Sequence, residues 1–90
     1  MDQNIEYLKD QQGRIIRWPK KKAEKLAVLR YINSKFEVGR IYSESEVNQL
    51  IDKWHNFCDY ALVRREMYNQ CLLERKPDGK EYWIDNKEEL

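Results

Sequence analysis

The order of helical and strand-like segments in this 90-residue sequence predicts an α+β fold. Three stretches repeat apolar residues at helical spacing, and the last of them runs into two short apolar stretches around the turn Pro77-Asp78-Gly79. A short strand-like run at 40–42 precedes the second helical stretch and can pair with that hairpin. This is the element order of a winged helix-turn-helix, with three helices and a small antiparallel β-hairpin wing.

The first helix is expected at about 20–36, because no breaker interrupts this stretch and apolar residues recur on one face. The β-branched run before it, residues 14–18, is expected to form an edge strand. Pro19 then suits the first helical position, where its missing N–H group costs no hydrogen bond. The residues that define the apolar face are Leu29, Ile32 and Phe36.

The second helix is the best defined by local chemistry. Ser43 followed by Glu46 is a capping box, in which the hydroxyl accepts from the third helical N–H group and the carboxylate accepts from the N–H group of Ser43. We expect this helix at about 44–55, with one apolar face. That face consists of Val47, Leu50, Ile51 and Trp54.

The third helix is expected to begin near Asp59 and to reach about Gln70. Its wheel separates two adjacent arginines, because Arg64 lies at the margin of the apolar face and Arg65 lies away from it. Arg64 is therefore interpreted as structural, and Arg65 as facing solvent or a partner. The inward face is predicted to comprise Tyr60, Val63, Met67 and Cys71. The opposite face is predicted to comprise Leu62, Arg65 and Asn69.

The length of 90 residues predicts one domain, because it leaves no room for a second core. The predicted domain spans 14–84, between an N-terminal tail at 1–13, either loose or a short helix, and a C-terminal tail at 85–90. No apolar run approaches the roughly 18 residues of a membrane span, and no signal-peptide pattern opens the sequence. A cytoplasmic protein with no membrane partner is the expectation.

The two cysteines predict neither a disulfide nor a metal site. Placed on one helix, Cys58 and Cys71 would lie about 20 Å apart, well beyond the ~7 Å limit for a disulfide. We expect both thiols to be reduced and partly buried, and we expect no metal and no cofactor. His55, Cys58 and Asp59 cluster in a turn without an anion-binding loop or a pair of oxyanion donors. We therefore expect no enzymatic activity, and His55 is interpreted as a helix-end residue that caps carbonyls.

Three stretches of the sequence carry a resemblance to a known family: "RWPKKKAEKLAVLRYINSKFEVGRIYSESEVNQLIDKWH", "DYALVRREM" and "LLERKPDGKEYW". Over roughly residues 17–84 the chain resembles the bacterial domain of unknown function catalogued under the number 2087. The matching features begin with a proline before basic residues, a Leu-rich first helix and an aromatic residue with a glutamate where the second helix begins. These are Pro19 to Lys22, Leu26 to Leu29 and Tyr42 to Val47.

The remaining features are an aspartate before paired arginines and a Leu-Leu-x-Arg wing. They correspond to Asp59 with Arg64 and Arg65, and to Leu72 to Arg75 with Gly79, Tyr82 and Trp83. The resemblance implies a small winged-helix-like domain of a kind often attached to bacterial transcription regulators, and it implies no established biochemical activity. Cys71 departs from the family pattern, which has a glycine at this helix end.

The charge is unevenly distributed, although the net charge is only +1. Residues 14–40 carry nine Lys or Arg against two Glu, a local charge of +7. Lysines in a first helical turn face the positive end of the helix dipole, at a cost of about 0.3–1 kcal/mol each. A bound phosphate would turn the conflict at Lys20, Lys21 and Lys22 into an anion site. The alternative is a lysine-rich surface screened by solvent and salt.

These features predict a DNA-binding winged helix, either a transcriptional regulator or an accessory domain of one, with the third helix in the major groove of double-stranded DNA. A homodimer that reads two half-sites is expected to go with it. For Arg65 and Asn69 the alternative is a solvated helix face. The candidate DNA contacts are Arg65, Asn69 and Leu62 on the third helix, Lys20, Lys21, Lys22 and Lys25 on the first, and Lys76 and Lys80 on the wing.

The rival interpretation is a protein-protein interaction module with the same fold and no DNA binding. Its main support is the near-neutral net charge. The wing adds to this, because its cations are balanced by Glu74, Asp78 and Glu81. Leu62 and Trp83 would then contact a protein partner.

Overall fold

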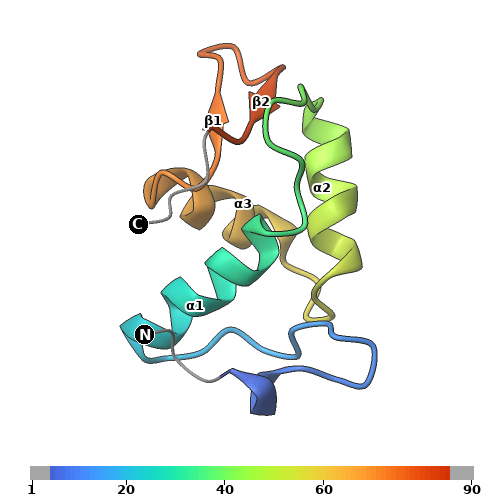
Figure 1. The fold of residues 1–90 in the computed structure, drawn as a ribbon, viewed down its shortest axis with the longest axis vertical. Helices are drawn as coiled ribbons and strands as arrows, with labels where there is room; N and C mark the ends of the chain where they lie inside the picture. Colours follow the sequence, from blue (N-terminus) through green and yellow to red (C-terminus); the bar gives the residue numbers. More distant parts are fainter. Residues whose placement is uncertain (1–4, 86–90) are drawn as a thin grey trace.

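The computed structural model of the chain describes residues 5–85. They form an α+β fold with the predicted winged helix-turn-helix arrangement, in which three helices precede a two-stranded antiparallel hairpin (Figure 1). A short 3-10 helix comes before them. The elements are η1 (Glu6–Leu8), α1 (Lys22–Asn33), α2 (Glu44–Lys53), α3 (Tyr60–Asn69), β1 (Glu74–Arg75) and β2 (Tyr82–Trp83).

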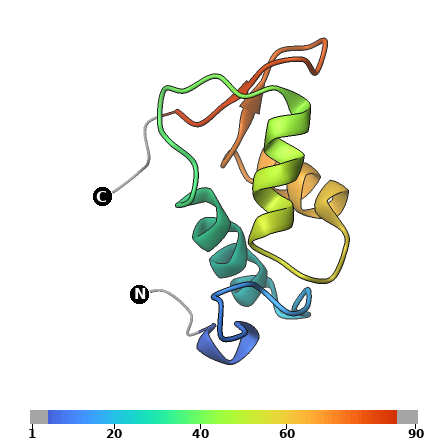
Figure 2. The ribbon, with the colours of Figure 1, turned by 90° about the vertical axis from the view of Figure 1, so that its right-hand side faces the viewer.

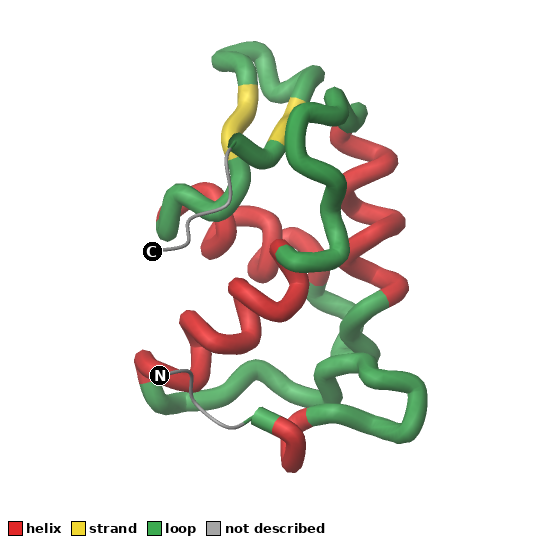
Figure 3. Tube along the Cα trace, viewed as in Figure 1, coloured by secondary structure: helices red, strands yellow, loops and turns green. Residues whose placement is uncertain are grey.

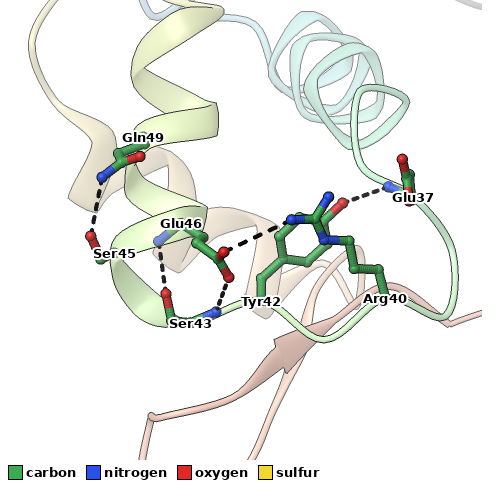
Figure 4. Close-up of polar contacts among 7 residues, drawn as sticks. All are labelled: Glu37, Arg40, Tyr42, Ser43, Ser45, Glu46 and Gln49. Atoms are coloured by element: carbon green, nitrogen blue, oxygen red, sulfur yellow. Dashed lines mark hydrogen bonds and ion pairs between the residues drawn. The ribbon is translucent and has the colours of Figure 1, made fainter.

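The start of α2 has the predicted capping box (Figure 4). The Ser43 hydroxyl accepts from the Glu46 N–H group at 3.1 Å, and the Glu46 carboxylate accepts from the Ser43 N–H group at 2.8 Å. Arg40 lies 3.8 Å from the same carboxylate, and the Tyr42 hydroxyl accepts from the Glu37 N–H group at 2.8 Å. The helix begins where predicted because these contacts are local. It ends at Lys53, earlier than expected.

The short strand before α2 pairs with the hairpin as predicted, through a single residue. Tyr42 and Tyr82 exchange two backbone hydrogen bonds of 2.8 Å. In the hairpin itself Arg75 pairs with Tyr82, and Gly79 takes a φ of +72° in the turn. Glycine is favoured at this angle because it lacks a Cβ atom. The Tyr42–Tyr82 pair therefore ties the hairpin to the segment that leads into α2.

The core lies where the three helices and the hairpin meet. The helix-turn-helix pair α2 and α3 pack together, and α1 packs against α3 (Figures 1 and 2). Burying these side chains removes apolar surface from water and stabilises the fold by roughly 25 cal/mol per Å². The fully buried core residues of the helices and hairpin are Val28, Leu29, Ile32, Val47, Ile51, Val63, Met67 and Leu73.

Part of the expected N-terminal tail packs into this core. Figure 3 shows the segment before α1 as loop with one short helix, passing along the lower edge of the molecule. Three residues of this segment are buried in the core: Ile5, Leu8 and Ile15. The Ile15 N–H group donates to the Trp54 carbonyl at 2.9 Å, and the Ile15 carbonyl accepts from Asn56 at 2.9 Å. This segment therefore closes the end of the molecule where α2 turns toward α3.

The predicted edge strand at 14–18 is wrong. Only Ile15 makes β-bridges, to Lys9 on one side and to His55 on the other. The β-branched run favours an extended chain, yet the partners on both sides are too short to extend a ladder. Within residues 5–85, no helix is long and apolar enough to cross a membrane.

The first helix is shorter at both ends than predicted. It begins at Lys22 with Lys21 as its N-cap, so Pro19 does not occupy the first helical position. Pro19 is instead fully buried before the helix. At the other end the chain tightens into turns, in which Phe36 donates to the Asn33 carbonyl at 3.1 Å. Phe36 still reaches the core, as predicted.

Both cysteines lie outside α3 and are exposed, so the expectation of a shared helix and partial burial is wrong. Cys58 and Cys71 have φ angles of +58° and +62°. At Cys71 this left-handed residue ends α3: its N–H group donates to the Tyr68 carbonyl at 3.0 Å, and that of Leu72 to the Met67 carbonyl at 2.8 Å. This pattern is a Schellman motif, which favours glycine.

Candidate nucleic-acid interface

Helix α3 presents two of the predicted contact residues to solvent. Asp59 is the N-cap of this helix, and its carboxylate accepts from the Leu62 N–H group at 3.2 Å. Val63 and Met67 are fully buried on its inner side. Arg65 and Asn69 are exposed, and Leu62 is partly buried. Tyr60, predicted to face inward, is 40% exposed instead, because it occupies the first turn beyond the edge of the core.

Arg64 and Arg65 differ as the wheel predicts. Arg64 donates a hydrogen bond to the Asn48 side chain and lies 3.5 Å from the Glu44 carboxylate, which ties α3 to α2. Within the described part of the chain, Arg65 has neither a hydrogen bond nor an ion pair. Arg65 is therefore free to reach a partner.

A hollow of about 320 Å³ lies between α3 and the hairpin, and we call it the arginine hollow. The Arg75 guanidinium stacks on the Tyr68 ring at 4.9 Å from its centroid, which joins the hairpin to α3. The lining contains three arginines and no carboxylate. The lining residues are Ala61, Arg64, Arg65, Tyr68, Arg75 and Tyr82.

The sequence reasoning missed Ala61, Tyr68 and Tyr82 in this hollow. One signal was present: Ala61 and Tyr68 are seven positions apart, so they share a helix face with the arginines between them. The approach of Arg75 to that face could not be predicted from the sequence, because it depends on how the chain turns after α3. In Figure 2, α3 and the hairpin tip lie on the same side of the molecule. The loop from α1 to α2 begins on the other side and passes beside β2 to the start of α2.

The two wing lysines have different surroundings. Lys76 lies 3.5 Å from the Glu81 carboxylate, so part of its charge is neutralised within the hairpin. Lys80 is exposed, and its N–H group donates to the Asp78 side chain at 2.9 Å in the turn. The local balance of charge on the hairpin is thus present in space as well as in sequence. Arg75 stands out from this balance because it turns toward α3.

The lysines at the start of α1 form a separate group. Lys20, Lys21 and Lys22 are exposed, and the N-cap Lys21 makes no side-chain cap. Lys25 is half-buried, with its ammonium 6.0 Å from the Trp18 ring centroid. The start of α1 and the hairpin lie at opposite ends of the molecule (Figures 1 and 2). The predicted lysine contacts therefore fall into two groups, with the predicted contacts of α3 between them.

The shifted pKa values lie away from this interface, in the N-terminal segment. The hydrogen bond from the Tyr7 hydroxyl to the Glu24 carboxylate raises the pKa of Tyr7. The backbone N–H group of Arg14 donates to the Asp10 carboxylate and lowers the pKa of Asp10. The first contact ties the segment to α1, and the second holds a turn within the segment.

His55 has the structural role predicted for a helix-end residue. It is buried, with Nδ1 2.8 Å from the Ile51 carbonyl, and its Nε2 accepts from the Asp59 N–H group at 3.0 Å. Since one ring nitrogen accepts, the other donates, and the ring is the neutral Nδ1–H tautomer. Both nitrogens are thus engaged with the backbone that joins α2 to α3.

Comparison with known proteins supplies a family and no activity. Neither the curated proteins nor the solved structures compared with the chain contain a match. A family model described as "Uncharacterized protein conserved in bacteria (DUF2087)" matches residues 14–84, which include all three helices and the hairpin. The chain belongs to this bacterial family.

Proposed function

We propose that this chain binds double-stranded DNA through its winged helix, as a transcriptional regulator or as an accessory domain of one. The observation that carries the proposal is the outer face of α3. Arg65 and Asn69 are exposed there, whereas Val63 and Met67 are buried. The helix α3 lies on the same side of the molecule as the hairpin tip (Figure 2). Arginine and asparagine are the side chains that hydrogen-bond guanine and adenine edges in pairs.

The other predicted contacts would position the chain on the duplex. With α3 in the major groove, Lys80 on the hairpin would reach the phosphate backbone beside the groove, as wings do in this fold. Lys20, Lys21 and Lys22 would hold phosphates at the other end of the molecule, where the start of α1 also favours an anion. One copy offers few base contacts, so a homodimer on two half-sites would supply the rest.

A fluorescence-anisotropy titration of random-sequence duplex at low salt tests the proposal. We expect the logarithm of the association constant to fall linearly with the logarithm of the salt concentration. The slope should be near −0.9 per phosphate contacted, roughly −4 to −6 in all. Arg65→Ala should lower the discrimination between sites, and Lys21→Ala should weaken all sequences alike. Absence of binding at tens of micromolar protein would contradict the proposal.

A second candidate function, a protein-interaction module, is favoured by an apolar hollow of about 420 Å³ elsewhere on the surface. Val38 and Ile41 line it and are both about half exposed, beside Trp83. Exposed apolar surface of this kind is typical of contact sites. Sedimentation velocity of the wild type and of Ile41→Asp tests it. Self-association that the substitution abolishes, in a chain that does not bind duplex, would favour this candidate.

A further inference from the structure

We infer that the arginine hollow is a phosphate-binding site, in which Arg75 and Arg64 hold one phosphate of the DNA backbone beside the groove. The inference rests on the proposed function and deepens it, because it assigns the backbone contact to a built site between α3 and the hairpin. Arg65 lies on the same hollow but on the outer face of the helix, from which it reaches base edges.

The positive charge of the hollow is only partly balanced within the protein, by the Glu44 carboxylate beside Arg64. Its lining holds three guanidinium groups and no carboxylate. Within residues 5–85, Arg75 has no hydrogen bond and no ion pair, and its stacking contact is with an uncharged ring. Like charges brought together raise the free energy of the empty site. A bound anion would relieve this repulsion.

The Arg75 guanidinium is held in place without using its donors. The Tyr68 ring lies 4.9 Å from it on one side, and its Nη1 atom approaches the Gly79 turn, 3.6 Å from where a Cβ atom would stand. Stacking restrains the plane of the group and leaves its five N–H donors available. A restrained guanidinium loses less entropy when it binds, and its fork matches two oxygens of a phosphate.

Arg64 adds a second guanidinium, which is held in position by contacts to two side chains of α2. Both of its polar contacts, to Asn48 and Glu44, are made from Nη1. The Nη2 and Nε groups make no hydrogen bond to residues 5–85. They are therefore available to the hollow. Two arginines from different elements then donate to one ligand, which suits a backbone phosphate because its two anionic oxygens point in different directions from a tetrahedral phosphorus.

The first arm of the experiment uses random-sequence duplex and Arg75→Ala. We expect affinity to fall by about tenfold or more, equally for all sequences, and the log–log salt slope to become less steep by about 0.9, the loss of one phosphate contact. Arg75→Lys keeps the charge without the planar guanidinium, so its affinity should lie between those of the wild type and Arg75→Ala. Thermal unfolding confirms that each variant is folded.

Arg40→Ala is the matched control. It removes the same charge from the loop between α1 and α2, where Arg40 lies 3.8 Å from the Glu46 carboxylate and outside the lining of the arginine hollow. We expect its salt slope to equal that of the wild type. An Arg75→Ala slope equal to the wild-type slope, or an equal loss in Arg40→Ala, would overturn the inference.

The second arm separates the source of the phosphate. The ¹⁵N–¹H signals of the arginine Nε groups are followed with inorganic phosphate and with chloride at equal ionic strength. A shift of the Arg75 signal with phosphate but not with chloride supports binding of free phosphate at this site. An equal shift with chloride would show that the hollow does not bind free phosphate specifically. Arg75-dependent duplex binding without such a shift assigns the site to the DNA backbone.

The two arms also separate this inference from the proposed function. Duplex binding that Arg75→Ala leaves unchanged upholds the proposed function and overturns the phosphate site. A chain that binds inorganic phosphate through Arg75 but binds no duplex retains an anion site in the hollow, and it overturns both the proposed function and the assignment of that site to the DNA backbone.

Discussion

At the scale of single residues, the end of α3 carries local strain. Cys71 adopts a φ of +62°, a region that costs a residue with a Cβ atom about 1–2 kcal/mol. The Schellman hydrogen bonds from Cys71 and Leu72 hold it there. Glycine, which the resemblance leads us to expect at this position, would adopt this angle without a clash at a Cβ atom.

We expect Cys71→Gly to raise the free energy of unfolding by about 0.5–1 kcal/mol, because relief of the left-handed strain exceeds the extra entropy that glycine loses on folding. Urea denaturation monitored by tryptophan fluorescence measures the change. Cys71→Ala is the control, since it keeps the Cβ atom and should change stability by less than about 0.5 kcal/mol. An equal gain in both variants would show that the thiol, and not the backbone, sets the effect.

Asp10 predicts a pH dependence of stability. Its carboxylate accepts the N–H groups of Arg14 and Gln12, each at 2.9 Å, and the first of these is the main cause of its lowered pKa. A lowered folded-state pKa means that the ionised form stabilises the fold. This contribution is complete above the ordinary pKa of 3.8 and is lost as pH falls through the lower folded value.

The expected result is a melting temperature that differs between wild type and Asp10→Asn at pH 6 and converges as pH falls below about 4. Differential scanning calorimetry across this range measures it. Asp52→Asn, at an exposed site on α2, should show no such convergence. A difference that is constant with pH would contradict the role given to the Asp10 charge.

At the scale of elements, the start of α2 is stabilised by the Ser43 hydroxyl, which caps the helix. Ser43→Ala should lower the free energy of unfolding by about 1 kcal/mol, because the Glu46 N–H group loses its acceptor. Ser45→Ala is a matched control within the first turn of the helix, where the hydroxyl accepts from the Gln49 side chain at 3.3 Å and caps no backbone N–H group. Chemical denaturation should show little change for it. Equal losses at the two serines would contradict the capping role.

The accuracy of the sequence predictions follows the range of the interactions involved. The capping box and the Gly79 turn were predictable because their partners lie within a few residues. Pro19 was misplaced because its burial before α1 depends on distant core residues. The edge strand at 14–18 was wrong for a similar reason, since strand propensity specifies an extended chain and says nothing of its partners.

The interface shows the same division. The exposure of Arg65 and the tie between Arg64 and α2 follow from the helical wheel of α3. The arginine hollow does not, because continuing the helix would have carried Arg75 away from Tyr68 along the axis. The left-handed Cys71 instead turns the chain, and the hairpin returns beside the helix. A single backbone angle thus separates the predictable part of the site from the rest.

At the scale of the whole molecule, the N-terminal segment is part of the fold. Leu8→Ala should cost about 2–5 kcal/mol of unfolding free energy, as for any fully buried leucine, because it leaves a cavity under α1. Ile16→Ala removes apolar atoms from the same segment at a 38% exposed site and should cost much less. Urea denaturation compares them. Equal small losses would show that residues 5–13 are dispensable for the fold.

The two basic groups are a property of the whole molecule as well. The sequence showed a local charge of +7 at 14–40, yet it could not show that the start of α1 lies at the opposite end from the hairpin (Figures 1 and 2). That separation depends on how α1 crosses α3 in the core. Any duplex that contacts both groups must therefore follow the long dimension of the molecule.

The positions of the cysteines make α3 unusually accessible to chemistry. Cys58 precedes the helix and Cys71 follows it, and both thiols are exposed. Replacing either one leaves a chain with a single attachment point at a known end of the helix. A DNA-cleaving reagent tethered at each end in turn would mark different nucleotides, and the offset between the two cleavage patterns would give the direction in which α3 lies on its target.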